Sequence, residues 1–174
     1  MKKIINIIVI FLIFLLIYFL QISIFNNYTI FNVKPNLFII FIFSIGIKYN
    51  KLFATITGLT IGFLIDLLIS NKIGINMILF GALGFTTSYL SQLLFSENKL
   101  TNILIIFIST CIMEIIKYFL NVVLLNINLE ITEFLFITFI EAVYNILIFI
   151  IIYPIWKKIL GKNNENEDKL IRYL

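Results

Sequence analysis

Apolar residues occupy most of the chain in six runs, each ended by a short cluster of polar residues. These runs cover residues 4–24, 37–47, 52–69, 77–95, 100–125 and 134–156. Because an α-helix rises about 1.5 Å per residue, about 20 apolar residues cross the hydrocarbon core of a membrane, which is about 30 Å thick. Five runs are long enough, whereas the second has only 11 residues. The pattern predicts an all-α integral membrane protein, a six-helix transmembrane bundle over residues 1–156, with a short tail over residues 157–174.

The short second run follows the tripeptide Lys34-Pro35-Asn36. A proline fits the first turn of a helix, because the N–H it lacks would have no partner there. We expect a short or re-entrant helix, lengthened by residues 30–33 entering at an angle. Non-helical backbone at membrane depth needs cover by protein. We count this run as a sixth crossing.

Composition agrees with lipid as the solvent. The chain of 174 residues is 61% hydrophobic and 13% charged, with a mean hydropathy of +1.10. Soluble domains contain about 45–50% apolar and about 25% charged residues. These values exclude a cytosolic enzyme, a secreted disulfide scaffold and a disordered tail. The net charge of +4 comes from basic residues at the ends of the apolar runs, so it indicates membrane orientation and no nucleic-acid partner.

The basic residues predict which side of the membrane holds the termini. With six crossings, ten of the 13 Lys and Arg residues lie on the side of both termini: Lys2, Lys3, Lys48, Lys51, Lys99, Lys157, Lys158, Lys162, Lys169 and Arg172. The other side carries Lys34 and Lys72. Basic residues concentrate in cytoplasmic loops. We therefore expect both termini in the cytoplasm of a multi-pass protein, and an uncleaved first helix, because no small-residue cleavage site follows it.

Small residues recur at helical spacing in the third and fourth runs. Gly58, Gly62 and Asp66 are four residues apart and share one face of a helix. In the fourth run the small residues are Gly81, Gly84, Ser88 and Ser91. Such spacing lets another helix approach closely. Packing within the chain is the simpler interpretation, and contact with a partner remains the alternative.

Four ionisable residues lie inside the runs: Asp66, Glu114, Lys117 and Glu141. Each costs about 2.5–3.5 kcal/mol at the centre of a membrane helix, so we expect them to face the interior and to find partners. Counting about 1.5 Å per residue places all four about 20–25 Å above the cytoplasmic surface. Three acids and one lysine cannot all be charged and paired in a dry site. We expect a protonated acid, or else water, a cation or a partner's basic group.

This polar cluster has three interpretations at this stage. It is a structural contact that fixes helix packing, a polar patch that binds a partner, or a site for a substrate or ion. The chain has no His and a single Cys, Cys111. It therefore lacks Ser-His and Cys-His pairs and the usual metal-ligand spacings, and it has no phosphate-binding glycine loop. We predict no enzymatic activity and no cofactor.

One stretch of the chain resembles a known family. Lys34-Pro35-Asn36 stands before a short apolar helix, and Gly58-x3-Gly62-x3-Asp66-Leu67-Leu68-x-Ser70-x3-Gly74 follows. This order and spacing resemble the rod shape-determining protein MreD family. Agreement in motifs covers residues 34–74, and agreement in length and hydropathy covers the whole chain. Asn36 stands where many relatives have Asp, and Asn71-Lys72 fills a loop that is commonly richer in glycine.

The resemblance implies a scaffold of the bacterial cell-elongation machinery in the plasma membrane, which maintains rod shape. Its implied partners are MreC, which has one membrane helix, the cytoskeletal MreB, and the peptidoglycan synthases RodA and a class B penicillin-binding protein. It also implies a six-helix fold similar to the S-components of energy-coupling-factor transporters, and Pro35, Asn36, Gly58, Gly62, Asp66, Ser70 and Gly74 as packing or partner-binding candidates. It supplies no catalytic residues.

A substrate-binding S-component of a vitamin transporter is the alternative function. In that case the buried polar cluster would hold the ligand. Such subunits typically dock their transport partner through small residues along the first helix. Residues 4–20 contain no Ala, Gly or Ser. The first helix therefore favours the scaffold.

Overall fold

The computed structural model describes residues 2–25, 27, 29–69, 73–93, 99–125 and 130–160. The described chain is all-helical apart from one isolated antiparallel bridge, as the hydropathy pattern predicted. Its six helices are α1 (Lys2–Ser23), α2 (Leu37–Lys48), α3 (Lys51–Leu68), α4 (Ile75–Leu93), α5 (Lys99–Leu125) and α6 (Ile131–Leu160). Each helix contains one of the six apolar runs, or most of it.

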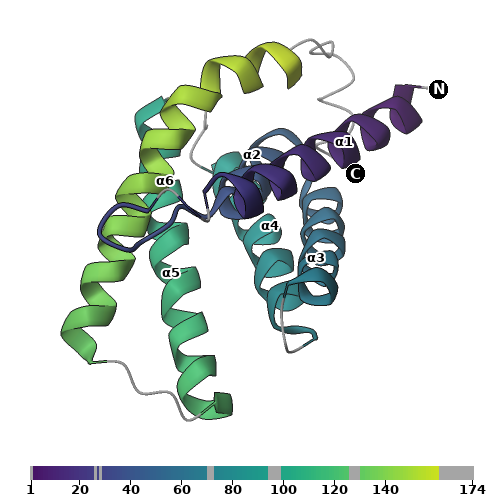
Figure 1. Cartoon of the computed structure of the whole chain (residues 1–174). Helices are drawn as coiled ribbons and strands as arrows, with labels where there is room; N and C mark the ends of the chain where they lie inside the picture. The colour runs from purple at the N-terminus through teal and green to yellow at the C-terminus, as the bar shows by residue number, and fades with distance from the viewer. Residues whose placement is uncertain are drawn as a thin grey trace.

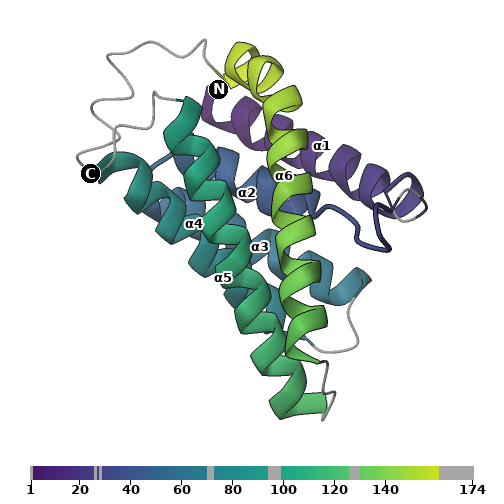
Figure 2. The same cartoon turned by 90° about the vertical axis from the view of Figure 1, so that its left-hand side faces the viewer.

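The helices form two antiparallel hairpins, α3–α4 and α5–α6, with α2 packed among them (Figure 1). The α3–α4 contact is the most extensive, followed by α2 against α4 and by α5 against α6. The α5–α6 hairpin leans away from α3–α4 toward the end of α5, and α1 crosses the bundle at an angle (Figures 1 and 2). The two hairpins are therefore splayed rather than parallel.

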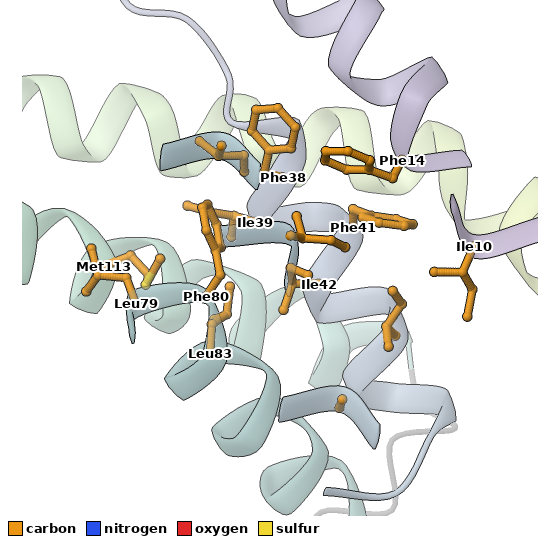
Figure 3. Close-up of a cluster of buried hydrophobic side chains, with 14 residues drawn as sticks. Ile10, Phe14, Phe38, Ile39, Phe41, Ile42, Leu79, Phe80, Leu83 and Met113 are labelled. Atoms are coloured by element: carbon orange, nitrogen blue, oxygen red, sulfur yellow. The ribbon is translucent and has the colours of Figure 1, made fainter. Parts of the chain in front are cut away.

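The core of the bundle is built around α2. Ten of its 12 residues are buried. Phe38 of α2 lies between Phe14 of α1 and Phe80 of α4, with ring centroids 6.3 and 6.4 Å away (Figure 3). Aromatic pairs at 4.5–7 Å are favourable. A helix this short is stabilised inside the bundle by contacts on all sides.

The outer surface is apolar and suits a lipid environment. Large apolar side chains such as Phe19, Leu104 and Ile151 are more than 60% exposed. Among the described residues, three helical segments are long and apolar enough to cross a membrane, at Lys51–Leu68, Lys99–Leu120 and Ile131–Pro154. Soluble proteins rarely expose such large apolar areas. The protein is therefore embedded in a membrane.

Residues 30–33 do not lengthen α2, and that prediction was wrong. Ile30 and Val33 exchange two backbone hydrogen bonds of 3.0 and 2.9 Å and close a tight turn. Phe31 and Asn32 at its centre have φ angles of 52° and 62°. Two consecutive positive φ values define a type I′ turn, which reverses the chain. The second helix therefore begins only at Leu37.

The last helix continues past the predicted end of its apolar run. Helix α6 passes through Pro154 and ends at Leu160. The remainder of the predicted tail, residues 161–174, lies outside the described residues, as do Ser70 and Lys72. The membrane boundaries of the six spans remain predictions.

Candidate functional site

The N-terminus of α2 lies among polar side chains inside the bundle. Asn36 is the N-cap, and its side chain accepts a hydrogen bond of 3.4 Å from the backbone N–H of Ile39. Pro35 is buried and precedes this cap. It therefore lies outside the helix, and the prediction that it occupies the first helical turn was wrong. An Asn side chain satisfies a free N–H at a helix start, which explains why the cap falls on Asn36.

Gln21 of α1 also contacts the start of α2. Its side-chain oxygen accepts a hydrogen bond of 2.9 Å from the backbone N–H of Leu37, and its amide nitrogen donates one of 2.9 Å to the carbonyl of Pro35. Both backbone groups would otherwise be unpaired inside the bundle. This role of Gln21 was not predicted from the sequence. The only signal was a polar residue in an otherwise apolar stretch.

Asn145 of α6 connects the start of α2 to the α5–α6 hairpin. Its side-chain oxygen accepts a hydrogen bond of 2.8 Å from the backbone N–H of Asn36, and its amide nitrogen donates one of 3.2 Å to the hydroxyl of Thr110 on α5. Asn145 and Thr110 are fully buried. One side chain therefore connects α2, α5 and α6.

Three of the four predicted ionisable residues come together beside Asn145. Glu114 and Lys117 form an ion pair three residues apart on α5. Glu141 of α6 is buried and interacts electrostatically with both, and its side chain also hydrogen-bonds those of Glu114 and Asn36. We call Asn36, Glu114, Lys117, Glu141 and Asn145 the polar junction. The two carboxyl groups can hydrogen-bond each other only when one of them is protonated.

Two buried oxygens beside the polar junction have no hydrogen-bond partner. They are Oε1 of Glu141 and Oγ1 of Thr138, which lie on neighbouring turns of α6. The two residues are only 8% and 6% exposed. Leaving a buried acceptor unpaired costs about 1–3 kcal/mol. The geometry therefore suits a hydrogen-bond donor or a basic group, and among the described residues no cluster of His, Cys, Asp and Glu fits a metal ion.

Asp66 does not join this group, contrary to the prediction. Its carboxylate accepts hydrogen bonds from the backbone N–H groups of Gly74, Asn76 and Met77, at 2.8, 3.2 and 3.1 Å. The side chain of Asn76 donates a further bond of 2.9 Å. Asp66 thus fixes the connection from α3 to α4. Counting residues along each helix failed because the splayed hairpins separate residues of equal count (Figure 1).

Gly58 and Gly62 face the backbone of α4. A Cβ atom at Gly58 would lie 2.7 Å from the carbonyl carbon of Phe80, and one at Gly62 would lie 2.6 Å from the Cα of Met77. Real Cβ atoms essentially never approach other heavy atoms within 3.0 Å. The two glycines therefore pack α3 against α4 within the chain. Gly74 has a φ of 105°, which glycine adopts without strain.

Comparison with known proteins identifies the family. The model of the family described as rod shape-determining protein MreD matches residues 1–162 of the 174 residues. No curated protein and no solved structure matches the chain. The family has a role in determining cell shape, and it is a family of structural membrane proteins that is not known for enzymatic activity. Since the match covers more than nine tenths of the sequence, the chain belongs to the MreD family of rod shape-determining proteins.

Proposed function

We propose that this protein is a non-enzymatic scaffold of the bacterial cell-elongation machinery. It binds MreC in the plane of the membrane and helps to position peptidoglycan synthases. Membership of the MreD family supports this role, since the family acts in determining cell shape. MreB, RodA and a class B penicillin-binding protein belong to the wider complex. The likeness to S-components of energy-coupling-factor transporters remains a prediction.

The polar junction is the proposed contact for MreC. The observation that carries this proposal is the unpaired Oε1 of Glu141, which is buried beside the Glu114–Lys117 ion pair. A hydrogen-bond donor or a basic group of a partner would pair this oxygen. Lys117 and Glu114 remain partly exposed, at 24% and 16%, so part of the junction can be reached from outside the chain. Complementary polar groups of this kind give specificity to an interface.

The proposed orientation places both termini in the cytoplasm and has six crossings of the bacterial plasma membrane. It rests on the ten basic residues on the side of the termini against two on the other side. In this orientation α5 runs outward and α6 runs inward. Glu114 and Lys117 then lie in the outer half of α5.

Affinity purification from membranes tests the scaffold. We expect MreC to co-purify with the wild-type protein and to be recovered several-fold less with Glu141→Gln, which replaces the carboxyl group that would bind a basic group of the partner. Glu133→Gln is the matched control, because Glu133 lies on the same helix but is exposed in its first turn. Equal recovery of MreC with both variants would move the contact away from the polar junction. Recovery of a transport ATPase without MreC would replace the scaffold by the S-component alternative.

A further inference from the structure

A second feature, separate from the polar junction, is a groove of about 300 Å³ between α4 and α5. The two helices lie side by side in the bundle (Figure 2). Leu79, Ala82 and Leu83 of α4 and Ile108, Ile112 and Met113 of α5 contribute apolar lining. The hydroxyl of Thr86, which also lines the groove, donates a hydrogen bond of 2.9 Å to the carbonyl of Ala82 on its own helix. This hydroxyl is therefore already satisfied, which suits an apolar occupant.

The dimensions of the groove fit a single hydrocarbon chain. Its lining on α4 runs from Leu79 to Leu90, which corresponds to about 16 Å of helix. This length is about half of the roughly 30 Å hydrocarbon core and therefore about one leaflet. An α-helix of about 10 Å diameter would occupy about 1,300 Å³ over the same length. The groove is about four times smaller than such a helix, so a helix could only rest against its opening, whereas a thinner hydrocarbon chain can lie inside it.

A positive charge lies at one end of this groove. Tyr89 lines that end, and Nζ of Lys51, the first residue of α3, lies 4.7 Å from the centre of its ring. Lys99 begins α5 on the same side of the bundle and is exposed. Tyrosine is enriched at the level of lipid headgroups, and lysine attracts anionic lipids there. The groove thus combines an apolar slot one leaflet long with a cationic, aromatic end.

We propose that this groove binds one anionic phospholipid. One acyl chain lies between α4 and α5, and the phosphate of the headgroup lies beside Lys51 and Tyr89. The site is independent of MreC binding. Only the choice of leaflet rests on the proposed function, whose orientation makes it the cytoplasmic leaflet.

Photo-crosslinking in lipid nanodiscs tests this site. The full chain is reconstituted with a trace of phosphatidylglycerol that carries a diazirine in one acyl chain, and labelled peptides are mapped by mass spectrometry. We expect labelling to concentrate on residues 79–90 and 108–116. A phosphatidylcholine probe with the same acyl chains should label these segments less. Equal labelling by both probes, or labelling spread evenly over the lipid-facing surface of α6, would overturn the proposal.

Two variants with matched controls test separately the apolar groove and the positive charge at its end. Ala82→Trp fills the groove from an exposed position and should reduce labelling several-fold, whereas Ile151→Trp, at an exposed position of α6 outside the lining, should not. Lys51→Gln should lower the preference for phosphatidylglycerol about fivefold, since a lysine near the membrane surface contributes about 1 kcal/mol. Lys34→Gln removes one charge elsewhere and should leave the preference for phosphatidylglycerol unchanged. Unaltered labelling in both Ala82→Trp and Lys51→Gln, with normal elution from a sizing column, would refute the site.

Discussion

Replacing Gly62 by alanine should destabilise the fold through the backbone of α4. The added Cβ would lie 2.6 Å from both the carbonyl carbon of Asn76 and the Cα of Met77. Ordinary contact begins at 3.4 Å, and the carbonyl oxygen of Asn76 would lie closer still, so the α4 backbone would have to retreat by more than about 0.8 Å. Overpacking of this kind costs about 1–3 kcal/mol. Alanine regains about 1 kcal/mol of helix propensity, which leaves a net loss of about 1–2 kcal/mol.

Gly81, across the same interface, provides the matched control. A Cβ there would also meet an atom at 2.6 Å, but that atom is Cδ2 of the Leu59 side chain, which can rotate away. Gly81→Ala should therefore stay within about 0.5 kcal/mol of the wild type. The free energy of unfolding is measured by SDS titration in mixed micelles. If Gly81→Ala is destabilised as much as Gly62→Ala, rigid backbone contact is not what requires glycine at residue 62.

Three further predictions concern the buried polar groups, and the same unfolding assay measures each of them. Asp66→Leu should cost about 2–4 kcal/mol by leaving helix-start N–H groups unpaired, and Asp66→Asn, which keeps one acceptor oxygen, should cost less; equal costs would contradict the capping role. Asn145→Leu should cost about 1–3 kcal/mol, because the backbone N–H of Asn36 loses its acceptor, and a neutral effect would contradict this contact. Lys117→Ala and Glu141→Gln should be coupled by about 0.5–3 kcal/mol in a double-mutant cycle, whereas additive effects would show that the two side chains do not interact.

The sequence predicts the helices well because hydropathy depends on local composition. Each of the six apolar runs corresponds to a helix, including the short one from Leu37 to Lys48. The convergence of Glu114, Lys117 and Glu141 was also accessible, since α5 and α6 form an antiparallel hairpin in which residue counts translate into depth. Local pattern and short connections are sufficient for these features.

Features that depend on helix inclination and distant contacts were not accessible. The position of Asp66 was misjudged because counting assumes that all helices run parallel to the membrane normal, whereas the hairpins are splayed (Figure 1). Asn36 is bonded by Asn145, which lies 109 residues later in the chain. Gln21 also hydrogen-bonds the start of α2, and it can do so only because the turn at residues 30–33 reverses the chain. No spacing rule links such positions.

The burial of α2 has a consequence for how this protein is assembled in the membrane. Twelve residues span only about 18 Å, so α2 is too short to insert as an independent transmembrane segment. It also has almost no surface left for lipid, since its neighbours cover ten of its residues. Its place exists only once α3, α4 and α6 surround it. We therefore expect the long helices to insert before α2 packs between them, and the start of α2, bonded by Gln21 and Asn145, to be the last part of the bundle to form.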